Sequence, residues 1–254
     1  MSEEVPLGVP VASHPARRPE RRAIEGRCAK LVPLDESHIP ALYQQLCNAA
    51  AAASVWAYMW VGPFESENDF RKYVREIIPS ENPIYYTVIM NENLPNGTRA
   101  GTPVGYLSLG RIDLANRSIE VGDVTFSAAL QRTTAATEAL YLAMRYCVEE
   151  LGNRRLEWRC DSLHAKSRRA AERLGFTYEG LFRQFKIFRG RNRDTTWYSV
   201  TDGDWTGQSV DGSGTQEIGL RRMFDIWLDP SNFVEGRQVR SLEKVREDLE
   251  SGRE

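Results

Sequence analysis

The sequence predicts an α/β (α+β) fold in which helices flank a central sheet. Residues 118–151 indicate a strand, a short loop and a helix, because the spacing of their apolar residues changes from two to three and four. Upstream, 85–90 and 104–109 indicate two strands of an antiparallel meander, joined by a loop that holds the turn signal Asn96–Gly97. These two stretches carry the prediction.

Composition indicates a globular domain with appendages. The 254 residues are 41% hydrophobic and 27% charged, and the formal net charge is −2. This charge gives no sign of a nucleic-acid partner, and no apolar run approaches the roughly 20 residues of a membrane span. The four cysteines lack metal-ligand spacing. We therefore expect a cytoplasmic protein with free thiols, no metal, and neither nucleic acid nor membrane as a partner.

Four segments are expected along the chain. Residues 1–26 are rich in proline and arginine and contain few large apolar residues, which predicts a disordered leader. The folded domain is expected at 27–205, and the Gly/Ser-rich stretch 206–217 is expected to be a flexible linker. In 218–254, apolar residues recur at helical spacing among many charges, which predicts a C-terminal helical extension.

The folded domain is predicted to begin with a strand and two helices. The strand covers 28–34, and after a first helix the apolar residues within 70–77 mark a second one. Between the helices lies an aromatic run with Trp56, Tyr58 and Trp60, which indicates a helix end followed by a loop. These three side chains either line a substrate pocket or pack in the core.

The strand that opens the central stretch is predicted to carry a β-bulge. Ile119 and Val121 alternate with polar neighbours, but after Gly122 the apolar positions become Val124 and Phe126. A phase slip of one residue at a glycine is typical of a bulge, and bulges often lie beside active sites.

The helix that follows starts at an anion-binding loop. Its apolar stripe runs from Ala136 to Leu151, and Thr133 and Thr134 are placed to cap it. Glu138 is expected in the first turn, where it would suit the helix dipole. The free N–H groups at such a helix start favour anions. An ordinary buried strand, loop and helix would show the same pattern.

The rest of the domain is predicted as a strand, a helix and two strands. Leu156, Trp158 and Cys160 alternate on one face of the first strand, and Gly175 is placed as the C-cap of the helix. The remaining predicted elements are the helix at 164–174, the strands at 176–188 and 195–201, and the turn at 190–194.

This order of elements resembles the GNAT N-acetyltransferases, in particular the branch of the RimJ and RimL ribosomal-protein N-terminal acetyltransferases. The resemblance is carried by the bulged strand, QRTTAATEA at 131–139, SRRAAERLGF at 167–176, and GRNRD followed by TTWYSV at 190–200. It covers about 27–205 and the WLDPSNF segment at 227–233. It implies a mixed, mostly antiparallel sheet that is splayed between its fourth and fifth strands.

The resemblance implies acetyl-coenzyme A as co-substrate. In that family, the backbone amides of the loop before the central helix cradle the pyrophosphate, and Thr134 stands where the usual glycine would be. The implied coenzyme-binding residues are Gln131, Arg132, Thr133, Thr134, Ala135 and Ala136 for the pyrophosphate, Val124, Thr125 and Phe126 for the pantetheine arm, and His164 in place of the family's asparagine.

The resemblance also implies candidates for proton transfer. Glu120 lies where several relatives keep a base that works through water, although an edge carboxylate paired with arginine would fit the same position. Asp123 is a second candidate. Ser167 matches the serine of the branch's N-x-x-S motif and is implied as the acid for the leaving thiolate. Many relatives have a tyrosine where this chain has Ala171, and Lys186 stands at the place of the RimL-like base.

The expected function is therefore acetyl-coenzyme A-dependent N-acetylation. A monomer or homodimer would move the acetyl group to a primary amine of a small molecule or a protein N-terminus by direct attack. Trp56, Tyr58 and Trp60 are the candidates for contact with the acceptor. The alternative is a catalytically silent acyl-coenzyme A-binding module, which the departures from the family pattern favour.

Overall fold

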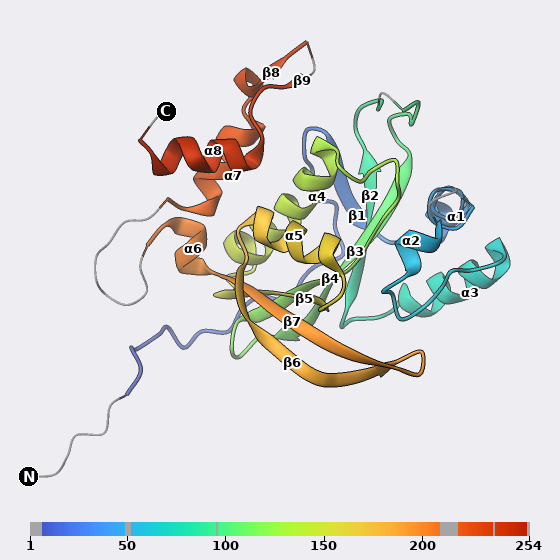
Figure 1. The fold of residues 1–254 in the computed structure, drawn as a ribbon, viewed down its shortest axis with the longest axis horizontal. Coiled ribbons are helices and arrows are strands. Elements are labelled where there is room, and N and C mark those ends of the chain that lie inside the picture. Colours follow the sequence, from blue (N-terminus) through green and yellow to red (C-terminus); the bar gives the residue numbers. More distant parts are fainter. Residues whose placement is uncertain (1–6, 49–51, 95, 209–217, 236, 253–254) are drawn as a thin grey trace, which may run out of the picture.

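The computed structural model describes residues 7–48, 52–94, 96–208, 218–235 and 237–252. In this part of the chain, seven strands form one sheet in the order β1-β2-β3-β4-β5-β7-β6, and two more form a hairpin (Figure 1). The strands are β1 (Ala29–Pro33), β2 (Ile84–Met90), β3 (Pro103–Asp113), β4 (Ser118–Phe126), β5 (Arg155–Asp161), β6 (Thr177–Phe188), β7 (Arg191–Thr201), β8 (Phe233–Val234) and β9 (Arg237–Gln238). The α-helices are α1 (Ile39–Leu46), α2 (Ala52–Trp56), α3 (Glu67–Ile77), α4 (Thr134–Arg145), α5 (Ala165–Leu174), α6 (Asp202–Thr206), α7 (Leu220–Leu228) and α8 (Leu242–Glu250).

The seven-stranded sheet is antiparallel except for β4 and β5, which run parallel. Their pairing involves only residues 118–120 with 155–157. Beyond Glu120 and Glu157, β4 pairs with β3 alone and β5 with β7 alone, so the sheet opens between the C-terminal ends of β4 and β5. The mixed sheet splayed between its fourth and fifth strands is thereby confirmed.

The predicted β-bulge is present in β4. Gly122 pairs with Ser108 and Thr125 pairs with Tyr106, so two residues of β4 face a single residue of β3. Asp123 adopts the left-handed conformation, with φ of 47°, and accommodates the extra residue. The bulge thus lies one residue beyond the glycine at which the apolar pattern slips.

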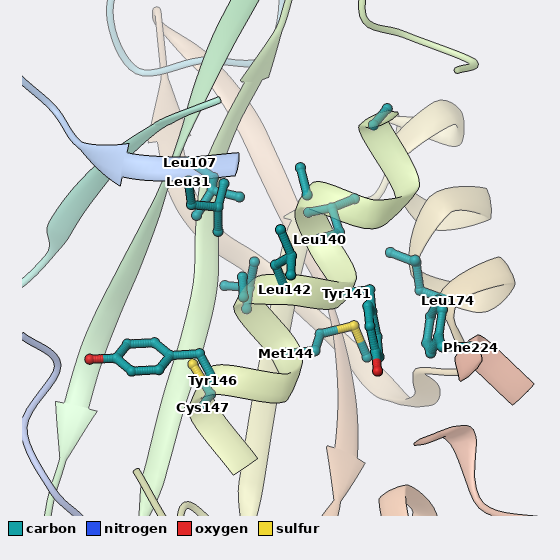
Figure 2. Packing of buried hydrophobic residues seen from close by; sticks show 14 of the residues in the cluster. Leu31, Leu107, Leu140, Tyr141, Leu142, Met144, Tyr146, Cys147, Leu174 and Phe224 are labelled. Carbon is teal, nitrogen blue, oxygen red and sulfur yellow. The ribbon is translucent and has the colours of Figure 1, made fainter. Parts of the chain in front are cut away.

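Helices cover both faces of the sheet. Alternate residues of a strand point to opposite faces, and the neighbours Tyr85 and Tyr86 accordingly belong to two different buried clusters. The cluster with Tyr85 lies under α1, α2 and α3. The cluster with Tyr86 lies between the sheet and α4, and it extends to α7 and α8 (Figure 2).

Helix α4 begins at the predicted cap. The Thr133 side chain accepts a hydrogen bond from the N–H of Ala136 at 3.1 Å. After Arg145 the chain continues as a π-helical turn over residues 146–150. Turns of this kind are rare in proteins, but many of those that occur lie at functional sites.

The prediction for Glu138 is wrong. Glu138 lies beyond the first turn of α4 and is buried, and its carboxylate accepts hydrogen bonds from the N–H groups of Arg27, Cys28 and Ala29 at 2.6–2.9 Å. These N–H groups belong to the start of β1. The carboxylate therefore joins α4 to the first strand instead of opposing the helix dipole, a contact that local spacing does not reveal.

The leader is partly docked on the domain. Ile24 exchanges backbone hydrogen bonds with Leu31 of β1, and the N–H of Ala16 donates to Leu114 O at 2.9 Å. Both Ala16 and Ile24 are buried. This differs from the disordered leader predicted for 1–26, because backbone hydrogen bonding can order a segment that has few large apolar side chains. Residues 1–6 lie outside the described residues.

The end of the domain also differs from the sequence prediction. Strand β7 starts at Arg191, so the turn that precedes it is formed by Arg189 and Gly190, earlier than the turn predicted at 190–194. Helix α6 runs across the expected domain boundary at 205, and residues 209–217 of the expected linker lie outside the described residues. Among the described helices, none is long and apolar enough to cross a membrane.

Candidate active site

The opening between β4 and β5 brings three predicted features together. These are the bulged half of β4, the loop at 127–133 that leads into α4, and the start of α5 after β5. Parallel strands that separate at their C-terminal ends leave backbone groups unpaired along the gap. The two helices that follow β4 and β5 both begin at this end of the sheet.

The loop before α4 is held by its own side chains. The Thr133 hydroxyl donates to Leu130 O at 2.7 Å, and Gln131 Nε2 donates to Phe126 O at 2.8 Å. Arg132 adopts a left-handed conformation, φ 64°, without being glycine. The first turn of a helix lacks intrahelical acceptors, so the N–H groups of Thr134 and Ala135 stay available for an anion. Anion binding at this loop stays a prediction, which these two N–H groups support.

The bulged part of β4 supplies free backbone along the opening. Val124 is half-buried, whereas Thr125 and Phe126 are buried, and the Thr125 hydroxyl donates to Asp123 O at 2.9 Å. These residues pair with β3 on one side only, because the pairing with β5 ends at Glu120. The edge of this segment that faces β5 therefore has no strand partner, and its main-chain groups there are available to a ligand.

His164 is the N-cap of α5, although its side chain makes no capping hydrogen bond. Its ring stacks on Tyr58, with centroids 4.3 Å apart and an interplanar angle of 14°, and Tyr58 Oη donates to Leu163 O at 3.2 Å. Burial lowers the pKa of His164, while the nearby Asp161 opposes the shift. The imidazole is therefore neutral near pH 7 and has both a donor and an acceptor nitrogen.

Ser167 lies one helical turn beyond His164. Its Oγ accepts a hydrogen bond from Trp158 Nε1 at 3.0 Å. An indole N–H is only a donor, so this bond uses a lone pair of the serine and leaves the hydroxyl hydrogen to be donated elsewhere. Trp158 thus fixes Ser167 in the state that an acid or hydrogen-bond donor needs.

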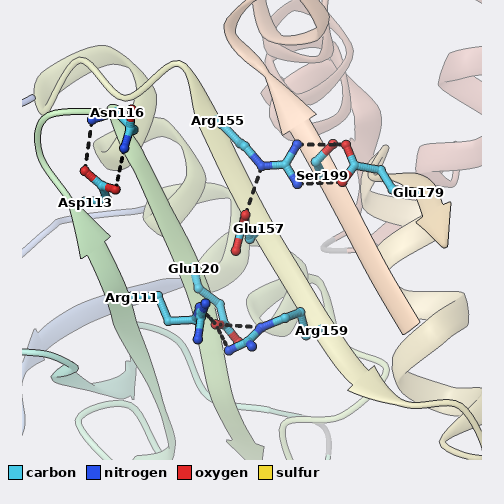
Figure 3. A network of polar contacts seen from close by, with 9 residues as sticks. All are labelled: Arg111, Asp113, Asn116, Glu120, Arg155, Glu157, Arg159, Glu179 and Ser199. Atoms are coloured by element: carbon cyan, nitrogen blue, oxygen red, sulfur yellow. Dashed lines mark hydrogen bonds and ion pairs between the residues drawn. The ribbon is translucent and has the colours of Figure 1, made fainter. Parts of the chain in front are cut away.

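Glu120 is held by two arginines on the other face of the sheet. Its Oε2 accepts from Nε of Arg159 at 3.0 Å and also contacts Nη2 of Arg159, while Nε of Arg111 lies 3.8 Å away (Figure 3). Both guanidinium groups lie over the Trp197 ring, 4.7 Å and 5.7 Å from its centroid. Burial raises the pKa of Glu120, and Arg159 opposes the shift. The structure thus contains the arginine pairing that the sequence left open as an alternative. The pKa of the Glu120 carboxyl is nevertheless raised.

The second oxygen of Glu120 lies over a glycine. A Cβ on Gly122 would stand 3.3 Å from Glu120 Oε1. A side chain at this position would crowd the oxygen, and the glycine avoids that contact.

Asp123 receives two hydroxyl groups at the bulge. Its Oδ2 accepts from Ser108 Oγ at 3.0 Å and from Tyr85 Oη at 3.2 Å. Burial, with the Asp123 charge as a second cause, raises the pKa of Tyr85. The aspartate is therefore fixed by β2 and β3, whereas Glu120 is fixed by β3 and β5. Tyr85 and Ser108 were not predicted, since only the strand register reveals that they face the bulge.

The three aromatic candidates for the acceptor site are not together. Trp56 is fully buried and donates from Nε1 to Leu46 O at 2.9 Å, so its assignment to the substrate site is wrong. Tyr58 is brought to His164, as described above. Trp60 is 53% exposed, with the Phe188 ring edge-on at 5.1 Å and the Arg193 guanidinium 4.7 Å from its centroid. Dense aromatic composition does not reveal which ring turns inward.

The sequence model described as “Acetyltransferase (GNAT) domain” matches residues 29–177, more than half of the chain. The chain belongs to the GNAT acetyltransferase family. The resemblance seen in the sequence is thereby confirmed, and the splayed strands and the loop before α4 all lie within the matched residues.

Solved structures and a curated relative agree with this membership. A GCN5-related N-acetyltransferase from Brucella melitensis is 34% identical, and the match covers 92% of this chain and 98% of that chain with a TM-score of 0.82. A “probable” GNAT-family acetyltransferase from Chromobacterium violaceum is also 34% identical, with 80% and 99% of the two chains covered and a TM-score of 0.70. “Putative ribosomal N-acetyltransferase YdaF” from Bacillus subtilis (strain 168) is 30% identical over 108 residues, which are 42% of this chain and 58% of that protein.

Ala171 and Lys186 of this GNAT chain differ from the residues that the family pattern has at these positions. Ala171, one turn after Ser167 in α5, is fully buried. This position therefore supplies no hydroxyl. Lys186 is exposed on β6, with its Nζ 5.4 Å from the centre of the Phe185 ring. Ser167 and Glu120 stay the predicted groups for proton transfer.

Proposed function

We propose that this protein transfers the acetyl group of acetyl-coenzyme A to a primary amine of a small molecule or of a protein N-terminus. The observation that carries the proposal is the opening between β4 and β5 beside the free N–H groups at the start of α4. In a chain of the GNAT family, this arrangement joins unpaired strand backbone to an anion site.

The residues around the opening fit acetyl-coenzyme A. Unpaired main-chain groups of residues 124–126 suit the amides of the pantetheine arm. The free N–H groups of Thr134 and Ala135, within the predicted loop 131–136, suit the pyrophosphate, and the neutral His164 suits a further hydrogen bond to the coenzyme. When bound, the coenzyme supplies an activated acetyl thioester.

We assign the proton transfers to Glu120 and Ser167. Trp158 and Arg159 are neighbours on β5 and point to opposite faces of the sheet, where they contact Ser167 and Glu120 respectively. The two groups therefore approach the opening from opposite sides. Glu120 Oε1 takes the proton of the ammonium through water, helped by its raised pKa. As the new C–N bond forms and the C–S bond breaks, Ser167 Oγ gives its proton to the leaving thiolate and regains one from solvent.

The acceptor is expected on the face that carries Glu120. A protein N-terminus and a small amine both offer the primary amine that the base requires. The Bacillus subtilis relative is named as a ribosomal N-acetyltransferase, so ribosomal proteins belong in the panel of acceptors to be tested.

The test is release of coenzyme A, measured with a thiol reagent across a panel of amines and N-terminal peptides. We expect acetyl-coenzyme A to bind in calorimetry and one class of amine to give turnover that Ser167→Ala lowers. Binding without turnover on any amine would identify the silent acyl-coenzyme A-binding module instead. Failure of acetyl-coenzyme A to bind would overturn both functions.

A further inference from the structure

The C-terminal extension packs against α4, although the matched GNAT domain ends at residue 177. Phe224 of α7 stacks on Tyr141 of α4, with centroids 4.8 Å apart and an interplanar angle of 28° (Figure 2). Tyr141 Oη also donates to Asp225 Oδ1 at 2.9 Å. The extension therefore contacts the same helix whose N-terminus forms the anion site.

Beyond α7, the chain turns back through the β8–β9 hairpin, and Asn232 fixes this turn. Its side chain is buried and donates to Trp227 O at 2.9 Å and to Arg240 O at 3.2 Å, while its Oδ1 accepts from the N–H of Arg240 at 2.9 Å. On β8, the centroid of the Phe233 ring lies 3.8 Å from the Arg27 guanidinium. The hairpin is thus anchored both to α7 and to the residues before β1.

Gln238 of β9 joins this hairpin to the anion loop. Its Nε2 donates to Trp227 O at 3.1 Å, and its Oε1 accepts from the Thr134 hydroxyl at 3.4 Å. A carbonyl oxygen only accepts, so the contact with Trp227 O orients the amide and directs Oε1 toward Thr134. Thr134 is the first residue of α4, and its N–H is one of those left for an anion.

A second connection runs through α8 and α5. Arg246 Nη2 donates to Arg173 O at 3.1 Å, and Arg173 Nη2 donates to the Thr137 hydroxyl at 2.9 Å. Thr137 is buried in α4, close to its start. The extension therefore supports the start of α4 at two places, Thr134 and Thr137.

We propose that the C-terminal extension is part of the coenzyme site, with Gln238 as a positioning residue for Thr134. Fixing the first residue of α4 orients its N–H for the pyrophosphate before the coenzyme arrives, which lowers the ordering cost of binding. This inference rests on the proposed function. It implies that the segment matched by the GNAT domain does not hold acetyl-coenzyme A with full affinity on its own.

The experiment compares full-length variants by calorimetry with acetyl-coenzyme A. Gln238→Met keeps the length of the side chain and removes both polar atoms, and Thr134→Val removes the hydroxyl. We expect each to raise Kd about three- to tenfold, and the double variant to be no weaker than Thr134→Val, because both changes break one contact. Val239→Ala is the matched control, since Val239 is 61% exposed on the same segment, and it should leave Kd unchanged.

Kinetics separate positioning from a merely structural role. Gln238→Met should raise KM for acetyl-coenzyme A while kcat at saturating coenzyme and KM for the amine stay within twofold. An unchanged Kd in Gln238→Met, or effects of the two substitutions that multiply, would overturn this inference alone, provided that the parent protein binds. A parent protein that does not bind acetyl-coenzyme A would overturn the proposed function, and this inference with it.

Discussion

The two sides of the opening that we assign to the coenzyme and to the acceptor, called the coenzyme side and the acceptor side, are built in different ways. On the coenzyme side, the loop before α4 is organised by residues close in sequence, such as Thr133 with Leu130 and Ala136. On the acceptor side, Glu120 and Asp123 are fixed by side chains from other strands, among them Arg159 and Tyr85. The phosphate site therefore depends first on local backbone groups, to which Gln238 and Arg173 add distant support, whereas the acceptor site depends throughout on contacts between distant segments.

This difference predicts where single substitutions act most strongly. On the coenzyme side, a changed charge meets the bound phosphates directly. On the acceptor side, removal of one charged group leaves another of the same sign nearby, because the same face carries two carboxylates and two arginines. Effects on binding should therefore be larger on the coenzyme side, and effects on pH dependence larger on the acceptor side.

The largest effect is expected for Thr134→Glu. The substitution places a carboxylate at the first residue of α4, against the pyrophosphate, and like charges in such a site cost several kcal/mol, or about 100-fold or more in affinity. Calorimetry with acetyl-coenzyme A measures the change. Thr134→Ser keeps the hydroxyl and serves as the control. An unchanged affinity in Thr134→Glu would place the pyrophosphate elsewhere.

A smaller effect is expected for Ser167→Ala. An alcohol is a weak acid, so loss of its proton should lower kcat by about 10- to 100-fold. Affinity for acetyl-coenzyme A should stay near that of the parent, because Ser167 is assigned to chemistry. Trp158→Phe removes the N–H that orients Ser167 together with part of a buried ring, and should lower kcat less. Steady-state kinetics on a verified amine would contradict the assignment if Ser167→Ala turned over like the parent.

Local features could be predicted from the sequence, whereas contacts between distant segments could not. The cap at Thr133, the β-bulge and the splayed sheet were predicted correctly, since each has a local pattern or a family motif. The ring stack of Tyr58 on His164 and the carboxylate of Glu138 on the start of β1 were not predicted. These contacts join residues about 106 to 110 positions apart, and no periodicity within one element specifies which side chain of another element it meets.

The burial of side chains and the docking of the leader were also predicted wrongly. Trp56 was assigned to the acceptor site, but the structure places it among core residues under α1 and α3. The leader was expected to be free of contacts, although Glu20 O accepts a hydrogen bond from Tyr86 Oη at 2.6 Å. Composition reports how much apolar surface a segment has, whereas docking through backbone groups depends on what lies beside it.

The next effect concerns Glu120, and it should depend on pH. Glu120→Gln is expected to lower kcat about 10-fold near pH 7, with a larger loss below the pKa of the acceptor amine, where the base must remove a proton. Because burial raises the pKa of Glu120, the parent should lose activity as the pH falls through that value. In Glu120→Gln the loss of activity should instead begin at the pKa of the acceptor amine, because only the neutral amine then reacts.

Asp123→Asn is the matched comparison for Glu120→Gln. The amide keeps an oxygen for Ser108 and Tyr85, so a supporting role predicts little change in the pH profile. If Asp123→Asn moves the loss of activity up to the pKa of the amine while Glu120→Gln overlays the parent, the base is Asp123. If both overlay the parent, the amine arrives already neutral.

The smallest effect is expected at the contact that joins the two sides, the ring stack of His164 on Tyr58. Burial lowers the folded pKa of His164 from its usual 6.5, so the unfolded chain binds the proton more tightly. The stability associated with the neutral ring is fully present above pH 6.5 and is lost as the pH falls through the folded pKa. His164→Gln removes this titration, so urea unfolding at pH 7.5 and 5.5 should show a smaller acid-induced drop in the free energy of unfolding than the parent shows. His38, whose pKa burial also lowers, lies on the acceptor side and is unchanged in this variant, so part of the drop should persist. An identical drop in parent and variant would mean that the stacked ring gains its proton as easily as it does in the unfolded chain.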